Sequence, residues 1–584
     1  MRAIASRRYT LPAAFLLLVP TVAFAAWPTD PTVNLPVCTA TQHQYAPVSV
    51  SDGAGGAIVA WYDYRLGSSA AIYAQHVLAG GGVDPAWPGD GRAICTANAL
   101  RQDPAITTDG AGGAIVTWTD RRSTTSDIYA QRVLASGVVD PAWPVDGTAL
   151  VIDLLDQSQA QIIADGAGGA VVTWLDSRSG NADIYAHHVL GNGVVDPAWP
   201  VNGRAVCFAA GAQEHPRIAM TGASNAVITW QDLRVGSSYD VYAQRVLLSG
   251  VVDPAWPGNG RLLCGATNSQ TGPVLASDGA GGAIVAWEDY RAGFVADVYA
   301  AHVSAGGAAD PSWPANGLVV CNAAGDQRYP AIVRDAANGA IVTWQDQRAG
   351  VPLDIYAQHV LVAGIVDGVW PANGAAACVA SGDQYTPSLA PDGSGGAVIA
   401  WIDYRSLVKA DIYASRVRAN GIVDPAWPAG GAAICTDAAD QYLVTLVSDG
   451  AGGAVLAWQD RRGGDDDIYA QRVNGSGVLG APTASVGPGG EGDPLAFAVP
   501  SPNPTRRTTA FRWTLPGAVN VRLVIRDTAG RTVRTLEDGM RAAGDHTTVW
   551  NLSDDRGRSV APGVYFARLE ALGLSRTQRI VVAR

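Results

Sequence analysis

Eight copies of the pattern Trp-x-Asp-x-Arg recur along the chain at an interval of 56 or 57 residues. Self-similarity at a period near 50 residues is typical of propellers and solenoids, because no single repeat can bury its apolar faces alone. A residue that is present in all eight copies is therefore expected to hold the scaffold and not to perform chemistry at one place. The tryptophans of the eight copies are Trp61, Trp118, Trp174, Trp230, Trp287, Trp344, Trp401 and Trp458.

Each repeat is expected to form four antiparallel strands. Its apolar segments are rich in β-branched and aromatic residues, and a turn of the type Asp-Gly-x-Gly-Gly, which tolerates positive φ angles, follows the first segment. No segment has helical periodicity, so the repeats predict an eight-bladed β-propeller. In the repeat that spans residues 102–151, the expected strands are Pro104–Thr107, Ala114–Asp120, Asp127–Val133 and Thr148–Ile152.

The two ends of the repeat array complement each other. The pair Trp27-Pro28 precedes the first Trp-x-Asp-x-Arg copy, so the strand expected at Leu35–Cys38 has no repeat of its own. The eighth repeat stops after Val473 with no Trp-Pro pair and no fourth strand. We therefore expect the leading strand to complete the last blade, which closes the ring and leaves no free edge.

Composition and the repeats define the expected domains. Residues 1–25 have the basic start, short apolar run and Ala-x-Ala site of a secretory signal peptide, with cleavage after Ala25. We assign residues 26–474 to the propeller, 475–494 to a flexible linker and 495–584 to a C-terminal domain. No other apolar stretch is long enough to cross a bilayer, so we expect a secreted or cell-surface protein with no transmembrane segment.

Charge is distributed unevenly along the chain. Residues 26–494 hold 23 basic and 45 acidic side chains, whereas residues 495–584 hold 14 basic and 7 acidic ones. An acidic repeat region repels phosphate backbones, so nucleic acid is not expected as a partner.

The C-terminal segment has its own motifs, which are Pro502–Pro504, Asp527–Arg531, Ala543–His546, Trp550, Asp554–Gly557 and Pro562–Tyr565. In these stretches, about the last 85 residues resemble FlgD-like Ig-like modules and type IX secretion (T9SS type A) sorting domains. The resemblance implies a small Ig-like β-sandwich, so the whole chain is expected to be all-β. In the sorting family such a domain engages the secretion machinery and directs transit of the outer membrane. A plain accessory Ig-like domain is the alternative, and Thr505 and Asn551-Leu552 depart from the family pattern.

The repeats are similar to secreted bacterial propeller repeats with Asp-Gly-x-Gly-Gly and Trp-x-Asp-x-Arg signatures. They lack the Ser-x-Asp-x-Gly-x-Thr-Trp box of sialidase-type propellers and the Gly-His and Trp-Asp pairs of WD40 blades. No specific activity follows from this resemblance.

The Asp and Arg of each repeat are interpreted as structural, because one active site must break the symmetry of the repeats. We expect an ion pair or a carboxylate-to-backbone bond between blades, and a repeated ligand or Ca²⁺ site is the alternative. Examples are Asp63 with Arg65, Asp120 with Arg122, and Asp460 with Arg462.

The cysteines and four of the histidines also recur with the repeat. Seven cysteines, from Cys38 to Cys435, occupy one position in seven repeats, where neighbouring blades are too far apart for a disulfide. We expect all seven to be reduced and buried as small apolar side chains. The histidines alternate with arginine at one strand position, which predicts a solvated polar face and no metal site. They are His76, His188, His302 and His359.

The chain has no motif that identifies an enzyme. It contains no His-Glu-x-x-His, no Gly-x-Ser-x-Gly and no Cys-x-x-Cys, so we expect no catalytic residue, no metal and no cofactor. The carboxylates Glu214, Glu288 and Asp103 occupy positions that vary among the repeats. They leave open the alternative of a carbohydrate-active enzyme, a glycoside hydrolase or lyase, on a propeller scaffold.

Strand direction predicts which face of the ring binds a ligand. The loops between the first and second strands and between the third and fourth emerge on one face, and these loops barely vary among the repeats. The other loops emerge on the opposite face, which we call the variable-loop face. We expect a protein or polysaccharide ligand there, bound by a non-catalytic module.

A glutamine near the start of each innermost strand is expected to form a structural ring at the channel mouth. The eight are Gln44, Gln102, Gln157, Gln213, Gln270, Gln327, Gln384 and Gln441. The next residue is Tyr45, Tyr385 or Tyr442 in three blades that closure makes adjacent, and we predict that these tyrosines contact the ligand. Apolar residues in nearby loops are further candidates, namely Phe294, Leu353 and Leu407.

Overall fold

The structure is a computed structural model, and it describes residues 27–480 together with 496–497, 503, 505–515, 519–527, 531–542, 544–571 and 574–583. The chain divides into two compact units, Met1–Pro482 and Thr483–Arg584. The expected signal peptide lies outside the described residues, as does most of the expected linker.

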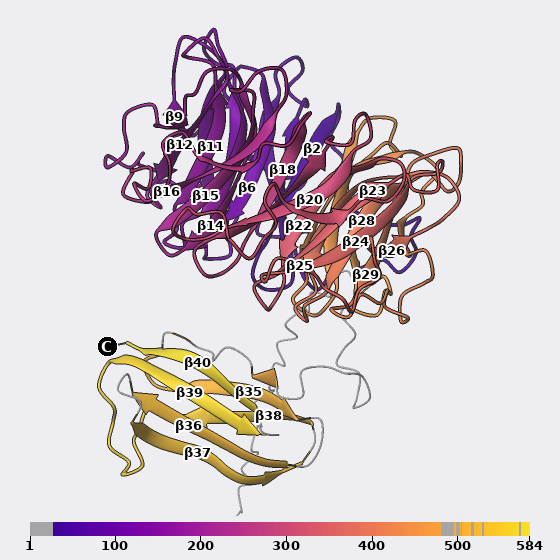
Figure 1. Ribbon diagram of the computed structural model, residues 1–584. Helices are drawn as coiled ribbons and strands as arrows, with labels where there is room; N and C mark the ends of the chain where they lie inside the picture. The colour runs from indigo at the N-terminus through magenta and orange to yellow at the C-terminus, as the bar shows by residue number, and fades with distance from the viewer. Residues whose placement is uncertain are drawn as a thin grey trace, which may run out of the picture. The chain divides into compact units, whose positions relative to one another are not determined.

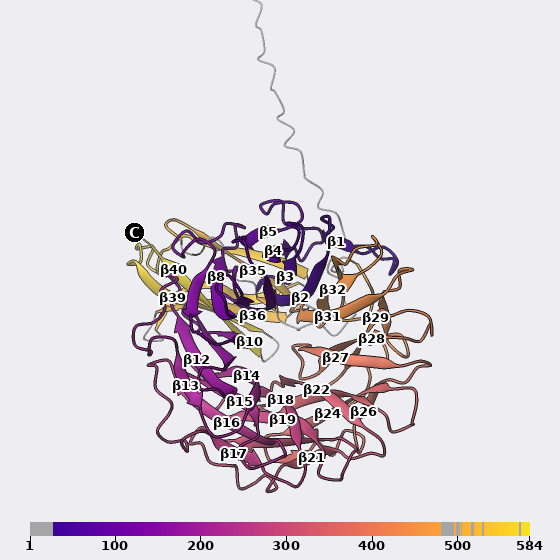
Figure 2. The same ribbon diagram turned by 90° about the horizontal axis from the view of Figure 1, so that it is seen from above.

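The first unit consists of eight antiparallel sheets arranged in a ring, as predicted from the repeats (Figures 1 and 2). Each sheet is one blade, and its first strand contacts the first strands of both neighbouring blades, so the first strands form the inside of the ring. In every blade except the last, the strands follow one another in chain order from the inside to the outside; in the last blade the outermost strand is the first strand of the chain.

The first and second strands of the blades carry most of the sequence signal. The first strands are β2 (Gln44–Ser51), β6 (Arg101–Thr108), β10 (Gln157–Ala164), β14 (Gln213–Gly222), β18 (Gln270–Ser277), β22 (Gln327–Arg334), β27 (Gln384–Pro391) and β31 (Gln441–Ser448). The second strands are β3 (Ala57–Asp63), β7 (Ala114–Asp120), β11 (Ala170–Asp176), β15 (Asn225–Asp232), β19 (Ala283–Asp289), β23 (Ala340–Asp346), β28 (Ala397–Asp403) and β32 (Ala454–Asp460).

The third and fourth strands complete the blades. The third strands are β4 (Ala71–Val77), β8 (Asp127–Val133), β12 (Asp183–Val189), β16 (Asp240–Leu247), β20 (Asp297–Val303), β24 (Asp354–Leu361), β29 (Asp411–Val417) and β33 (Asp467–Val473). The fourth strands are β5 (Arg92–Cys95), β9 (Thr148–Val151), β13 (Arg204–Cys207), β17 (Arg261–Cys264), β21 (Leu318–Cys321), β26 (Ala375–Cys378), β30 (Ala432–Cys435) and β1 (Leu35–Cys38). A two-residue strand, β25 (Ile365–Val366), also pairs with β24.

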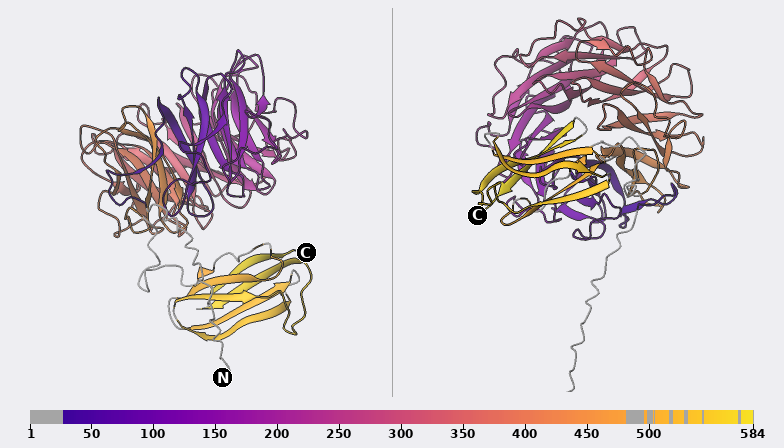
Figure 3. Two further views of the ribbon diagram at one scale, coloured as in Figure 1. Left: turned by 180° about the vertical axis from the view of Figure 1, so that it is seen from behind. Right: turned by 90° about the horizontal axis from the view of Figure 1, so that it is seen from below.

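The leading strand closes the ring. Strand β1 pairs antiparallel with β33, with Leu35 opposite Ala470 and Pro36 opposite Tyr469. The indigo start and the orange end of this unit therefore meet in one sheet (Figure 3). Closure removes the two unpaired edges that an open array of blades would expose.

The hydrophobic core lies between the blades. The second strands are almost wholly buried, because they are β-branched or aromatic and are covered by a neighbouring sheet on each side. All eight repeat tryptophans are fully buried. A Cβ on Gly91, which has φ of +95°, would lie 2.7 Å from Cη2 of Trp61, so the backbone must approach the indole closely there.

The tryptophans of the Trp-Pro pairs connect neighbouring blades. The indole N–H of Trp87 donates to the carbonyl of Ala135 in the next blade at 3.2 Å. Trp27 closes the series, because its N–H donates to the carbonyl of Ala79 in the first blade at 3.0 Å. The same bond is made by all eight of these tryptophans.

The second unit is a β-sandwich, drawn in orange to yellow in Figure 3. Its two sheets enclose a core that includes Phe511, Trp550 and Leu569. One sheet has the order β34 (Ala496–Phe497), β35 (Thr509–Leu515), β38 (Gly544–Trp550). The other has the order β37 (Thr532–Arg541), β36 (Val519–Asp527), β39 (Gly563–Ala571), β40 (Leu574–Val582).

Candidate functional site

The Trp-x-Asp-x-Arg side chains form a buried polar cluster in every blade. In the first blade, Oδ2 of Asp63 accepts the indole N–H of Trp61 at 2.8 Å and the guanidinium of Arg65 at 2.6 Å. The guanidinium also lies 3.9 Å from the centroid of the Tyr73 ring. The ion pair lies within one blade and not between two, which corrects the expected geometry, because Asp and Arg are only two residues apart at one strand end. The same pair forms at Asp120–Arg122 and Asp460–Arg462.

The cysteines connect this cluster to the preceding blade. All seven are free and buried, as predicted. They are not simple apolar side chains, however, because Nη2 of Arg65 donates to Sγ of Cys38 at 3.0 Å across the interface between the last and first blades. Burial raises the pKa of the Cys38 thiol to about 12, so the sulfur remains a neutral acceptor.

The repeated histidines are buried, and the prediction of a solvated face was wrong. His76 is 8 % exposed, with Nδ1 2.9 Å from Oδ2 of Asp84 and Nε2 3.0 Å from Oδ2 of Asp52. Burial opposes the charge on His76, but the bonds to the two carboxylates outweigh it and raise the imidazole pKa. The remaining oxygen of Asp52 accepts the backbone N–H groups of Ala54 and Gly56.

The same clamp of one basic side chain between carboxylates explains why one face of the ring barely varies. The two aspartates come from the Asp-Gly-x-Gly-Gly turn and from the loop between the third and fourth strands, which both lie on that face. His188, His302 and His359 each bind two aspartates in the same way. Arginine replaces histidine in the other blades, as at Arg132 with Asp109. That face is therefore occupied by scaffold contacts.

The glutamines at the start of the innermost strands are buried, but one of them was assigned wrongly. In the second blade, Arg101 and not Gln102 pairs with the aspartate of the repeat, as Gln44 does with Asp63 in the first blade. Arg101 is fully buried, and its Nε lies 3.0 Å from Oδ2 of Asp120. The glutamine directly after Arg101 was matched to the glutamines of the other repeats, which placed this repeat one residue out of register.

A β-bulge follows the start of every innermost strand. The register to the second strand shifts there in all eight blades, and the bulged residue has φ between 46° and 59°. Seven of the eight are not glycine, and this backbone region costs such residues on the order of 1 kcal/mol each. No two blades share the same residue. The eight are Ala46, Asp103, Gln159, His215, Gly272, Tyr329, Thr386 and Leu443.

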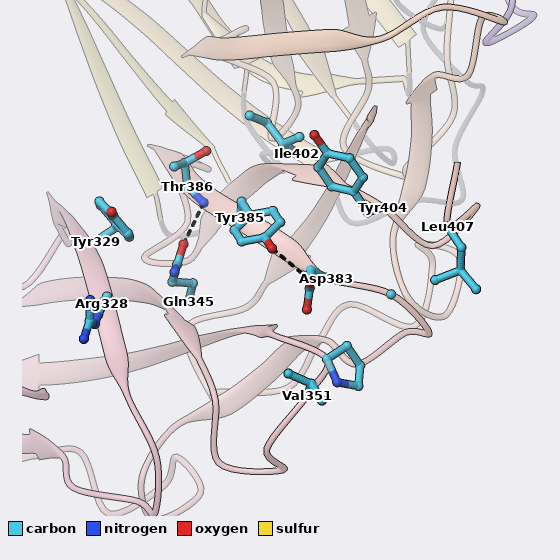
Figure 4. A pocket seen from close by; sticks show the side chains of 12 residues that line it. Arg328, Tyr329, Gln345, Val351, Asp383, Tyr385, Thr386, Ile402, Tyr404 and Leu407 are labelled. Atoms are coloured by element: carbon cyan, nitrogen blue, oxygen red, sulfur yellow. Dashed lines mark hydrogen bonds between the residues drawn. The ribbon is translucent and has the colours of Figure 1, made fainter. Parts of the chain in front are cut away.

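A pocket of about 910 Å³ lies between the sixth and seventh blades on the variable-loop face (Figure 4). The bulges contribute two successive side chains from each innermost strand, which an unbroken strand would direct to opposite faces. These pairs are Arg328 with Tyr329 and Tyr385 with Thr386. The remaining lining side chains are Gln345, Val351, Pro352, Asp383, Ile402, Tyr404 and Leu407, with Gly382.

Hydrogen bonds hold the polar groups of the pocket in place. The hydroxyl of Tyr385 donates to Oδ2 of Asp383 at 2.8 Å, and Oδ1 of the same carboxylate accepts the backbone N–H of Leu353 at 2.8 Å. Burial and the bond to Asp383 raise the pKa of Tyr385 to about 12. The ring of Tyr404 packs edge-on against that of Tyr385, with centroids 5.7 Å apart.

The structure brings only part of the predicted site together. Tyr385 and Leu407 line the pocket, and Leu353 contributes its backbone N–H. Tyr442 lies one blade further on, with its ring centroid 5.3 Å from the Arg461 guanidinium carbon. Phe294 is 98 % exposed and is not one of the residues that line this pocket.

Tyr45 belongs to a separate aromatic cluster in the first blade. Its ring stacks on that of His43 with centroids 5.4 Å apart, and it also contacts the rings of Tyr62 and Tyr64. Ligand contact by Tyr45, Tyr385 and Tyr442 stays a prediction. All three are half-buried, so their truncation would also disturb packing.

Sequence reasoning missed Arg328, Tyr329, Asp383 and Tyr404. Tyr329 could have been found, because the residue two positions after the first-strand glutamine differs in every repeat. Tyr404 stands at the x position between Asp and Arg of the repeat, where no special signal marks it.

The variable carboxylates do not form a catalytic pair in this pocket. Oε1 of Glu288 accepts the backbone N–H of the bulged Tyr329 at 2.8 Å. Gln345, at the equivalent position of the next blade, accepts the N–H of Thr386 in the same way at 3.2 Å. Since a neutral amide replaces the carboxylate, the role of Glu288 in this bond is structural.

Glu214 and Asp103 lie in other blades. Oε2 of Glu214 accepts the hydroxyl of Tyr239 at 2.9 Å. Asp103 is a bulged residue in the second blade. Burial raises the pKa of Tyr62 to about 12, and the charge of Asp103 adds to that shift. Neither residue lines the pocket between the sixth and seventh blades.

Two further findings concern the described part of the chain. No group of three or more His, Cys, Asp or Glu side chains in it is arranged to hold a metal ion. It also holds no helix that is both long enough and apolar enough to span a membrane.

Comparison with solved structures finds distant propeller-fold neighbours. A PL25 ulvan lyase has a TM-score of 0.40 and 10 % identity, and the match covers 65 % of this chain and 94 % of that one. The GH93 α-L-arabinofuranosidase of Fusarium graminearum, solved with arabinobiose, has a TM-score of 0.35 and 12 % identity over 64 % and 93 % of the two chains. A protein of unknown function from Dyadobacter fermentans has a TM-score of 0.33 and 11 % identity over 56 % and 97 %. Likenesses this distant carry no conclusion about activity.

Comparison with curated proteins gives no match. Residues 503–573 match the FlgD Ig-like domain. The chain is therefore an all-β protein in which eight propeller-like blades precede a FlgD Ig-like domain.

Proposed function

We propose that this protein is a secreted or cell-surface binding module that holds a macromolecular ligand on the variable-loop face and does not catalyse a reaction. The observation that carries the proposal is the pocket between the sixth and seventh blades, which is lined by residues of two bulged strands and by three tyrosines. The bulged residue has a strained backbone in seven of the eight blades, and its side chain differs from blade to blade. This supports a binding role, because the scaffold does not require different side chains at that position.

The charged groups of the pocket support binding over catalysis. Asp383 is the one carboxylate among the residues that line it, and both of its oxygens already accept hydrogen bonds. Glycosidases of the usual kind use two carboxyl groups across the scissile bond. The alternative, a carbohydrate-active enzyme, therefore lacks its second carboxyl group among these lining residues.

Sequence features near both ends of the chain support a location outside the cytoplasm. The start has the pattern of a signal peptide, and the FlgD Ig-like domain at the other end fits a surface or secreted protein. We propose that this domain serves export or attachment, with recognition by a secretion machinery as its specific form.

A paired-variant experiment tests the binding proposal. Tyr329 and Leu407 are 54 % and 76 % exposed, so replacing both with Ala should leave the fold intact while it removes binding to ligands found on glycan and peptide arrays. Val145 and Val201 are 89 % and 90 % exposed and lie in loops of the opposite face, so the V145A/V201A variant is the control.

Retained binding by the Tyr329→Ala/Leu407→Ala variant would refute this location for the site. Equal loss in both variants would do the same. Accumulation of shortened glycan products during incubation would favour the enzyme alternative.

A further inference from the structure

We infer that the ligand of the pocket between the sixth and seventh blades is a neutral polysaccharide chain, a proposal that rests on the binding function above. The pocket combines flat aromatic surface with fixed hydrogen-bonding groups. Its three tyrosines, Tyr329, Tyr385 and Tyr404, supply rings against which the C–H faces of sugars can pack. Its floor and walls supply side chains that exchange hydrogen bonds with hydroxyls.

The polar groups of the pocket argue against an apolar peptide side chain. Gln345 uses its carbonyl oxygen to accept the N–H of Thr386, and its NH₂ group has two donors to offer. Each oxygen of Asp383 accepts one bond within the protein and has capacity for another. An apolar side chain would strip water from these groups without replacing its hydrogen bonds, whereas sugar hydroxyls both donate and accept.

Charge argues against an acidic ligand. The repeat region from 26 to 494 has 45 acidic and 23 basic side chains. The one cationic residue that lines the pocket, Arg328, is already paired with Asp326 at 3.0 Å. The excess of acidic side chains in the repeat region repels uronates, sulfated sugars and acidic peptides, so a neutral chain fits better.

Contacts within the protein hold the backbone of Tyr329 and the side chain of Tyr385 in place without a ligand. Tyr329 is positioned by its bulge and by the bond from its N–H to Glu288 at 2.8 Å. Tyr385 is held by Asp383 and by the edge of the Tyr404 ring. Binding to such a surface orders few side chains, which matters because single sugar contacts are weak.

The size of the pocket favours several sugar units over one. Its volume of about 910 Å³ is at the upper end of the range for small-molecule sites. The lining residues Val351 and Leu407 are 79 % and 76 % exposed, so a chain can continue past them beyond the pocket. Affinity is therefore expected to rise with chain length.

The test uses calorimetric titration of the mature protein with three sets of probes. The first set is neutral oligosaccharides of one to six units, namely β-1,4-glucans, xylans, mannans and α-1,5-arabinans. The second set is oligogalacturonates of the same lengths, and the third is a library of neutral apolar peptides. We expect at least one neutral series to bind with affinity that rises up to three or more units, and about tenfold weaker binding or none with oligogalacturonates.

Variants connect that binding to the pocket. Tyr329→Ala should weaken oligosaccharide binding by about tenfold or more, because it removes an exposed ring and little else. Leu66→Ala is a control of similar exposure, since Leu66 is 53 % exposed in the loop after the second strand of the first blade and does not line this pocket.

The outcomes separate the ligand class from the binding function. If only peptides or oligogalacturonates bind and Tyr329→Ala abolishes that binding, the site stands and the neutral polysaccharide is refuted. If oligosaccharides bind and Tyr329→Ala has no effect, both the ligand site and the inference fail. The absence of binding by every neutral series overturns the inference.

Discussion

Raising the pH should destabilise the propeller through the histidine clamp at His76, and replacing His76 with Arg should prevent that loss. His76 has a carboxylate on each ring nitrogen, with Asp84 at 2.9 Å and Asp52 at 3.0 Å. Only the protonated imidazole can donate to both. Neutral imidazole keeps one N–H, so one of the two carboxylates then faces a nitrogen lone pair in a buried site.

The sign of the effect follows from the direction of the pKa shift. The pKa of His76 is raised in the folded protein, so the clamp contributes stability that is fully present below the unfolded-state pKa of about 6.5. That stability is lost as the pH rises through the folded-state pKa. Each unit by which the pKa is raised corresponds to about 1.4 kcal/mol.

The magnitude can be bounded from the bond that is lost. A hydrogen bond to a charged group contributes about 1.5–3 kcal/mol, and deprotonation removes one such bond at His76. Arginine fills the equivalent position in other blades and keeps its charge at every accessible pH, as Arg132 does beside Asp109. His76→Arg should therefore match the wild type near pH 5.5 and exceed its unfolding free energy by about 1.5–3 kcal/mol near pH 9.

The assay is urea unfolding of both proteins at several pH values, followed by tryptophan fluorescence. The difference between their unfolding free energies, plotted against pH, gives the folded-state pKa of His76 directly. A difference that does not change between pH 5.5 and 9 would refute the clamp.

Three other predictions test the scaffold. All seven thiols should be unreactive toward Ellman's reagent in the native protein and react after denaturation, and one fast native thiol would contradict their burial. Asp63→Ala should lower the unfolding free energy by about 3–5 kcal/mol because it leaves the Arg65 guanidinium buried without its carboxylate, and wild-type stability would exclude that role. Gly91→Ala should lower the melting temperature more than Gly67→Ala does. Both glycines have φ near +94°, but only a Cβ on Gly91 would collide with Trp61. Equal melting temperatures of the two variants would argue against the close approach.

Much of the fold could be predicted because the repeat pattern is dense. The strands expected at Ala114–Asp120 and Asp127–Val133 have those bounds in the structure, since Gly-rich turns and buried β-branched runs mark them clearly. Strand β1 could be assigned to the last blade from the mismatch of the two ends alone.

The site was predictable only in part, because its residues come from different blades. Variation between copies pointed to the face that carries the pocket and to Tyr385 and Leu407, which line it. Nothing in the sequence indicated that the sixth and seventh blades would share a pocket while Tyr45 would pack in a cluster of its own. Whether a tyrosine lines a pocket or packs in a cluster depends on how loops of one blade pack against the next blade. Those contacts join residues far apart in the sequence, so local patterns do not report them.

The sequence by itself determined the number of blades, the closure of the ring and the burial of the cysteines, because each follows from a signal repeated at fixed spacing. Only the tertiary structure decided that His76 is clamped between two aspartates, that Arg101 replaces a glutamine, and that bulges turn successive side chains into one pocket. The physical reason is that these features depend on the register between strands. A shift of one residue moves a side chain to the opposite face, and spacing along the chain does not report it.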